Sequence, residues 1–477
     1  MNTKKRFSRD LLLWLAPLAF LALFYFYPLA SIIETSFQRA EQSVIATFWE
    51  ALTSPSLQRV VAFTLWQAML STLLTLLIGL PGAYLLARYR FRGKALLQAL
   101  MGIPFVLPTV VVAAAFNALL GPRGWVNVLL MDWFHLSQAP IQFVNSLVAI
   151  LVAHVFYNTT IVLRMVGDFW AHLDPRIDQA AQVLGANRWQ TLKRITMPLL
   201  MPAISAAALL VFIFDFTSFG VILILGGPRY ATLEVEIYYQ ATSLFNLPLA
   251  AVLSILQLLC TLALTVIYSR LSLRLSRPLS LRPQAYTQRK LLSWRTRVSA
   301  AVMITMLLSL LTLPLFGLAV RSFTHLNIGS DPSQATSGLT LAYYRELSVN
   351  RRASLFYAPP AAAIAVSLAY AAATVVLALA LGLPASWALA KTSATGRSFS
   401  DRLNRWLDPL FMLPLGTSAV TLGLGFILAL SRPPLDLRTS PALIPLAHTL
   451  VALPFVVRSL TPALRSIRPR LRAAAAV

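Results

Sequence analysis

The stretch that decides the fold is DPRIDQAAQVLGANRWQTLKRITMP, residues 174–198. It begins with Asp174 and Pro175, a pair that favours a helix start because Asp caps the first turn and Pro fits its first position. Apolar side chains then recur at the spacing of one helical face, at Ile177, Ala180, Ala181 and Leu184. Gly185 predicts a break, followed by a second short helix from about Arg188. A short exposed apolar helix of this kind predicts a docking element for a partner protein or for the bilayer surface.

Long apolar runs flank this stretch on both sides. Of the 477 residues, 58% are hydrophobic and 12% charged, whereas soluble domains hold about 45–50% apolar and about 25% charged residues. Several runs reach or approach the roughly 20 residues that a helix needs to cross a bilayer. The sequence therefore predicts an all-α membrane protein of about ten transmembrane helices: Leu11–Ile33, Val60–Ala87, Leu96–Leu120, Ser146–Val166, Met197–Leu225, Leu247–Leu271, Val298–Val320, Ala361–Ala390, Trp406–Leu430 and Ala442–Leu464.

The net charge is +24, and the positions of the basic residues follow the predicted membrane topology. With the N-terminus in the cytoplasm, most of the 40 Lys and Arg residues fall in cytoplasmic segments, among them Arg88–Lys94, Arg176–Arg194 and Arg270–Arg297. This is the positive-inside bias of membrane proteins. The basic residues therefore predict membrane lipids as partners and no nucleic acid. The expected location is the bacterial cytoplasmic (inner) membrane, crossed many times.

The chain contains two related halves on either side of a basic linker. Short motifs recur, since Gly79-Leu80-Pro81 matches Gly382-Leu383-Pro384, and Ala153–Val183 aligns without gaps on Ala447–Val477. Both halves have the same orientation by charge, which predicts parallel repeats with a transport path between them. The predicted domains are residues 1–271 (first repeat, six transmembrane helices), 272–297 (linker) and 298–477 (second repeat).

The second half stops at Val477, inside the segment equivalent to residues 174–198. The equivalents of Leu184–Leu271 are missing, and a version with both halves of equal length would hold about twelve helices. We therefore expect the second repeat to be incomplete and the chain to be truncated at its C-terminus.

Residues 174–198 resemble the cytoplasmic EAA loop of ABC importer permeases. Asp178 stands for the Glu of that consensus, with one extra residue before the alanine pair. In the family this loop docks in the ATPase subunit, so the resemblance implies a type I ABC importer permease fold. The coupling residues that it implies are Asp178, Ala180, Ala181, Leu184, Gly185, Arg188, Ile195 and Pro198. The second, partial copy holds Arg472, Ala474 and Ala475 and has no acidic residue.

Two halves fused in one chain are similar to the ferric-iron and thiamine permease group, as are Trp66-Gln67-Ala68, Ala153–Asn158 and Phe216–Gly220. The resemblance implies a transport subunit rather than an enzyme. Its substrate would be ferric iron or thiamine, delivered by a periplasmic or lipid-anchored binding protein. The chain has no GxxxxGK[ST] phosphate loop, so a separate ABC ATPase would bind and hydrolyse ATP. We expect no cofactor and no metal in the permease itself.

Four polar or ionisable residues fall within predicted spans and are candidates for the translocation path: His154, Asn158, Asp215 and His448. An intramembrane ionisable residue is a functional candidate by default. The alternative for the histidines, and the more frequent case, is a neutral side chain that bonds between helices. For Asp215, a pair with a neighbouring helix competes with a lining position in a path for cationic substrates.

Two other classes of function compete with the importer interpretation. A secondary, ion-coupled transporter with two six-helix halves is the main alternative, but it usually carries several charged or polar residues near the midplane, and this sequence has few. A membrane-embedded enzyme would need His, Asp and Glu clustered at one depth, and the sequence has no such cluster. Neighbouring genes for an ATPase and a binding protein would discriminate between the classes.

Overall fold

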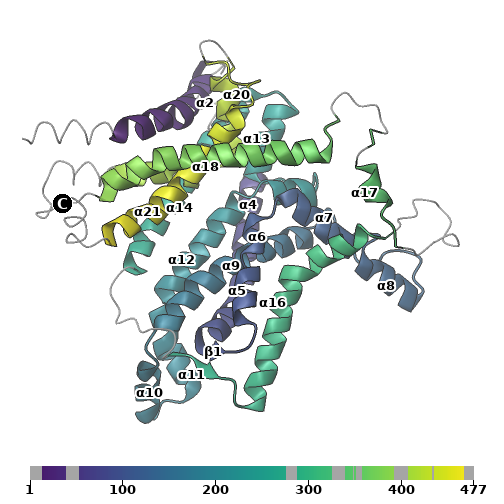
Figure 1. Ribbon diagram of the computed structural model, residues 1–477, viewed down its shortest axis with the longest axis vertical. Helices are drawn as coiled ribbons and strands as arrows, with labels where there is room; N and C mark the ends of the chain where they lie inside the picture. Colours follow the sequence, from purple (N-terminus) through teal and green to yellow (C-terminus); the bar gives the residue numbers. More distant parts are fainter. Residues whose placement is uncertain are drawn as a thin grey trace, which may run out of the picture. The chain divides into compact units, whose positions relative to one another are not determined.

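The computed structural model describes residues 13–38, 53–275, 287–324, 339–347, 349–350, 357–390, 407–431 and 435–466. The chain forms two compact units, and Figure 1 shows that both are built from helices. Unit 1 contains Met1–Leu52, Ile237–Leu262 and Arg345–Val477, and unit 2 contains Thr53–Glu236 and Ala263–Tyr344.

The first sequence half supplies most of unit 2. Two of its long helices, α4 and α9, start at serine caps, because Ser54 accepts a hydrogen bond from Leu57 N and Ser146 accepts one from Ala149 N. The elements that begin in unit 2 are α4 (Pro55–Arg88), β1 (Tyr89–Arg90), α5 (Lys94–Leu100), α6 (Ile103–Val106), α7 (Thr109–Leu120), α8 (Trp125–Phe134), α9 (Leu147–His172), α10 (Pro175–Val183), α11 (Arg188–Thr191), η2 (Leu192–Thr196), α12 (Met197–Phe216), η3 (Ile222–Gly226), α13 (Leu233–Thr242), β2 (Arg289–Lys290), α16 (Trp294–Arg321) and α17 (Ala342–Glu346).

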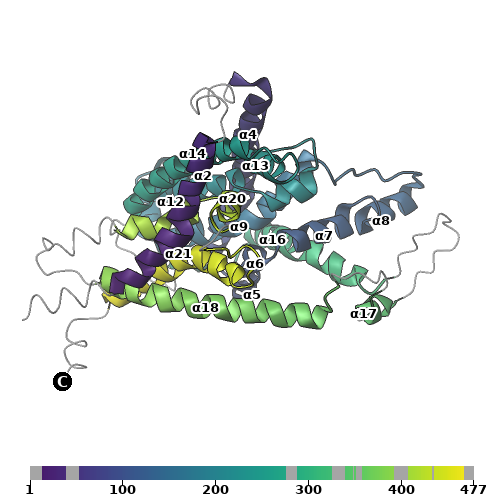
Figure 2. The ribbon, with the colours of Figure 1, turned by 90° about the horizontal axis from the view of Figure 1, so that it is seen from above.

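Unit 1 combines helices from both ends of the chain. Helix α14 (Leu247–Leu275) begins in unit 1 and ends in unit 2. The other elements of unit 1 are η1 (Ala22–Phe26), α2 (Tyr27–Gln38), α18 (Pro360–Ala390), η5 (Leu413–Gly416), α20 (Ala419–Ala429) and α21 (Leu443–Ser466). Figure 2 shows α18 and α21 packed along each other.

Each unit contains one pair of long helices packed along each other. In unit 2, α4 packs along α9, and α12 packs against both. Buried Leu163, Val166, Leu200 and Leu307 belong to the core of this bundle. In unit 1, α18 and α21 form the equivalent pair, with Leu389, Leu450 and Leu453 buried. One long helix pair in each sequence half, α4 with α9 and α18 with α21, therefore packs side by side.

The compact units do not coincide with the two sequence halves. Helix α16, from the second half, packs on α7 and α4 in unit 2, and its Leu307 and Leu311 are buried in that core. Helix α2, from the first half, packs on α20 in unit 1. Unit 2 thus contains α16 from the second half of the sequence, and unit 1 contains α2 and the start of α14 from the first half.

Three of the ten predicted spans are interrupted. The run Leu96–Leu120 divides into α5, α6 and α7, because Leu107 and Pro108 are extended and a residue before proline avoids the helical region. Trp406–Leu430 divides near Pro414, where Ser418 caps the new helix α20. Met197–Leu225 divides after Phe216, where α12 ends. The apolar composition of these three runs did not predict where their helices break.

Within the described ranges, nine helices are long and apolar enough to cross a membrane. They include Leu13–Thr35, Thr109–Phe134 and Trp294–Arg321. The C-terminal residues 467–477, where the second repeat is expected to be incomplete, lie outside the described residues.

Candidate functional site

Residues 174–198 fold as the two short helices that their sequence predicts. Asp174 Oδ1 accepts a hydrogen bond from Arg176 N at 3.0 Å and caps α10. Gly185 has φ +91°, in the left-handed region that glycine tolerates and other residues rarely adopt. Asn187 and Gln190 then form a capping box at the start of α11. This helix continues through η2 into the transmembrane helix α12 without a break.

The loop presents an apolar surface to solvent. Val183 and Leu184 are 87% and 88% exposed, and Trp189 is 69% exposed. Ile177 and Ala180 are also exposed on α10. We call these five residues the loop face: Ile177, Ala180, Val183, Leu184 and Trp189. Figure 1 shows α10 and α11 together beside β1 at one end of unit 2.

The remaining predicted coupling residues divide by exposure. Ala181 is 7% exposed and faces the protein, which differs from the exposed position expected for it. Arg188 and Pro198 are exposed, and Ile195 is half-buried. Arg472, Ala474 and Ala475 of the partial second loop lie outside the described residues.

Asp178 attaches the loop to the transmembrane bundle. Its Oδ2 accepts a hydrogen bond from Arg88 Nη2 at 2.8 Å, and its Oδ1 accepts one from Thr196 Oγ1 at 2.8 Å. The side chains of Arg88 and Asp178 are 9% and 21% exposed, so the ion pair is largely shielded from water. A single carboxylate thus joins α10 to the end of α4 and to the start of α12.

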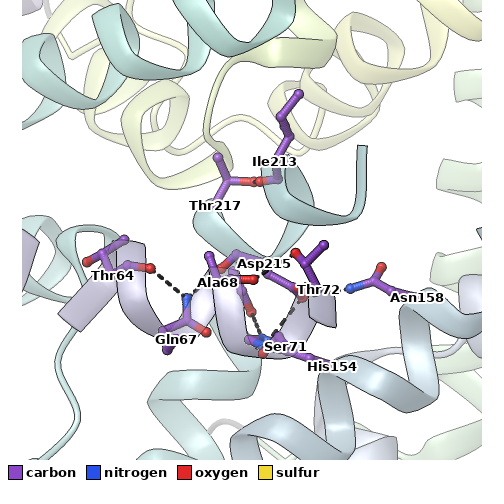
Figure 3. Close-up of polar contacts among 11 residues, drawn as sticks. Thr64, Gln67, Ala68, Ser71, Thr72, His154, Asn158, Ile213, Asp215 and Thr217 are labelled. Carbon is purple, nitrogen blue, oxygen red and sulfur yellow. Dashed lines mark hydrogen bonds and ion pairs between the residues drawn. The ribbon is translucent and has the colours of Figure 1, made fainter. Parts of the chain in front are cut away.

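A buried polar cluster joins α4, α9 and α12 within the bundle (Figure 3). Asn158 Nδ2 donates to Asp215 Oδ1 at 2.7 Å, and His154 Nδ1 lies 3.4 Å from the same oxygen. His154 Nδ1 also lies 3.0 Å from Ser71 Oγ, and its Nε2 lies 2.8 Å from Ser218 Oγ. Three of the four predicted path residues are therefore in one network.

The polar cluster lies where α12 ends inside the apolar region. Gln67 Nε2 donates to the backbone oxygen of Asp215 at 2.8 Å, as Figure 3 shows, and so satisfies a carbonyl at the last turn of the helix. Irregular backbone at membrane depth requires such partners. Asp215 is fully buried, and its Oδ2 has no hydrogen-bond partner among the described residues. The cluster can therefore stabilise the helix break and accept one further donor.

His448, the fourth candidate, lies on α21 of unit 1 with its side chain exposed. Sequence reasoning did not select Arg88, Thr196, Ser71 or Ser218 as site residues. Gln67 belonged to a motif that suggested the permease group but carried no assigned role. Among the described residues, no group of three or more His, Cys, Asp and Glu side chains is placed to hold a metal ion.

Comparison with known proteins gives consistent matches. Residues 76–277 match the family described as "Binding-protein-dependent transport system inner membrane component". The chain is 32% identical over 210 residues to the sulfate transport system permease protein CysT of Escherichia coli, covering 44% of this chain and 72% of CysT. It is 26% identical over 437 residues to the thiamine transport system permease protein ThiP of E. coli, covering 88% of this chain and 73% of ThiP.

The crystal structure of a bacterial ABC transporter involved in the import of alginate is also similar. It shares 21% sequence identity and a TM-score of 0.47, over 58% of this chain and all of that one.

Proposed function

The chain belongs to the family of binding-protein-dependent transport system inner membrane components, and on this premise we propose that it forms the translocation path of an importer of thiamine. The match to ThiP supports thiamine as the proposed substrate, because it spans 88% of the chain and includes both sequence halves. The match to the sulfate permease CysT covers 44% of the chain. Ferric iron, the other substrate expected from the sequence, has no comparable support.

The loop face is the proposed docking surface for the ATPase subunit that hydrolyses ATP. Its exposed side chains are apolar, and burying them in a protein groove is favourable at about 25 cal/mol per Å². Asp178 would transmit movement of the docked loop, since its carboxylate holds both α4 and the start of α12. ATP binding is assigned to that partner subunit, and the permease needs no cofactor of its own.

The buried polar cluster is the proposed polar lining of the path near the break after α12. A buried carboxylate with a free acceptor oxygen suits a cationic substrate such as thiamine. The binding protein would deliver the substrate at the end of the helices opposite the loop face.

Deletion of the gene in its own bacterium tests the substrate, because the native cell supplies the ATPase and the binding protein. Uptake of labelled thiamine, ferric iron and sulfate is measured in the deletion strain and after complementation. We expect thiamine uptake alone to fall and to recover. Loss of sulfate or iron uptake with normal thiamine uptake would reject the proposed substrate while keeping the importer.

Single-cysteine labelling tests the proposed orientation, in which the N-terminus and the loop face are cytoplasmic. In a Cys260→Ala background, a cysteine at exposed Lys290 on β2 should resist a membrane-impermeant reagent in intact cells. A cysteine at Trp133, 72% exposed on α8, should react. The reverse pattern would invert the topology.

A further inference from the structure

A cavity of about 250 Å³ lies between α4, α5 and α9, apart from the loop face and the buried polar cluster. Its walls include the buried apolar side chains of Leu86, Met101 and Leu163. Its polar residues are Gln98, Arg164 and Asp168, all exposed. The volume is several times the roughly 30 Å³ share of one water molecule in the liquid. The cavity therefore has room for a small charged group.

The cavity holds one positive and one negative side chain on the same face of α9. Arg164 and Asp168 are four residues apart, a spacing that places side chains on one helical face. Neither takes part in an ion pair in the described part of the chain. The guanidinium lies against the backbone of Gly102, where a β-carbon would stand 3.4 Å from Arg164 Nη2. His172, Arg164 and Lys94 interact electrostatically with Asp168, but none of them forms a direct ion pair with it in the described part of the chain.

The position along the helices suits a lipid headgroup. Arg164 lies eight residues before His172, the end of α9 that leads to the loop face, a rise of about 12 Å. A charged side chain at this depth lies near the headgroup layer and normally has a counter-ion. Lys94, Arg90 and Arg92 add positive charge at the same end of the bundle. This leaflet is the cytoplasmic one in the proposed topology.

Apolar residues continue from the cavity in the direction that acyl chains would take. Helix α5 carries Gln98, and the next helix, α6, carries Phe105 and Val106, which are 57% and 79% exposed. A ligand held at Gln98 would therefore have an uncovered apolar surface beside it.

We propose that this cavity binds the headgroup of a phospholipid that carries both a phosphate and a primary ammonium, that is, phosphatidylethanolamine. The Arg164 guanidinium and the Gln98 amide donate to the phosphate, and the Asp168 carboxylate accepts from the ammonium. One cation and one anion in the cavity match one anion and one cation in the headgroup. The proposal does not depend on which substrate the importer carries.

The repeat supplies a matched control. Arg458 is the counterpart of Arg164 and is also exposed, on α21. In the same alignment, Pro462 stands where the first repeat has Asp168. The second repeat therefore carries the cation without the carboxylate and should not select this headgroup.

Native mass spectrometry of the full chain in neutral detergent tests the proposal with added phosphatidylethanolamine, phosphatidylglycerol or phosphatidylcholine. The wild type should prefer phosphatidylethanolamine. Arg164→Gln should bind it about tenfold more weakly, since one charge-assisted contact is lost. Asp168→Asn should lose the preference over phosphatidylglycerol. Arg458→Gln should bind as the wild type does.

Equal losses in Arg164→Gln and Arg458→Gln, or no headgroup preference in the wild type, would overturn the proposal. Soluble O-phosphoethanolamine is the second probe, and binding as tight as that of the lipid would reject a membrane source. Size-exclusion chromatography checks that each variant is folded. If Arg164→Gln aggregates, Gln98→Ala replaces it, with a smaller expected loss in the same direction.

Discussion

Gly79 of α4 lies against Val162 of α9 so closely that a β-carbon on the glycine would stand 2.7 Å from Val162 Cβ. The second sequence half has a matching contact, because a β-carbon on Gly382 would collide with Val456 Cγ1. Glycine therefore sets the distance between the two long helices of each pair.

Gly79→Ala should destabilise the chain by about 1–3 kcal/mol, because the added methyl group has no space at the helix crossing. The measurement is the thermal unfolding midpoint in detergent. Val162→Ala in the same chain should restore part of the loss, since it removes Cγ1, which would also stand 2.7 Å from the added carbon, and leaves only Cβ in the way. Gly423→Ala is the control, because a β-carbon at Gly423 meets nothing within 4 Å. Equal midpoints for Gly79→Ala and Gly423→Ala would contradict the close contact.

Asp178→Asn should lower substrate uptake about tenfold while the chain still inserts in the membrane. The change removes the negative charge that Arg88 faces at 2.8 Å and leaves a shielded cation unpaired, which is costly. Uptake and ATPase co-purification are measured in the complemented deletion strain. Asp132→Asn, at an exposed position on α8, provides a matched loss of charge. Full uptake in Asp178→Asn would show that the ion pair does not transmit movement.

The two neighbouring alanines of α10 should respond differently to a tryptophan. Ala180→Trp places the ring on the loop face, so ATPase co-purification should fall with the loop intact. Ala181→Trp places it at a buried position, so the loop itself should unfold locally. Limited proteolysis distinguishes them, with faster cleavage near Gly185 expected for Ala181→Trp. Similar cleavage of both variants would mean that Ala181 is not buried in the membrane-embedded protein.

Two substitutions of Asp215 separate structure from transport. Asp215→Asn keeps an acceptor for Asn158, whereas Asp215→Ala leaves that buried amide unpaired at a cost of about 1–3 kcal/mol. We expect only the alanine variant to lower the thermal midpoint, and both to lower thiamine uptake at least about tenfold. Normal uptake by Asp215→Asn would assign the carboxylate a purely structural role.

The local sequence predicted the two short helices of residues 174–198 and the break between them. The contacts that it did not predict join residues far apart in the chain. Asp174, Gly185 and Asn187 act on backbone within a few residues, so the break between the two helices follows from their order. The partner of Asp178 is Arg88, 90 residues away, and nothing in the local pattern favours this arginine over its neighbours.

The interior of the bundle was predictable only in part for a related reason. Hydropathy located His154 and Asp215 within spans, but small hydroxyl groups such as those of Ser71 and Ser218 are common in membrane helices and carry no signal. Hydropathy is also the same on either side of a helix break, so the end of α12 at Phe216 was missed.

The packing of α2 in unit 1 has a consequence for when its contacts can form during synthesis. Tyr25 Oη lies 2.7 Å from Thr417 Oγ1, across 392 residues of sequence. At about 5–20 residues per second, the ribosome needs roughly 20–80 s to make the chain between them. During that time α2 exists without α20, on which it packs in unit 1. The packing partners of α2 in unit 1 are thus made long after α2 itself.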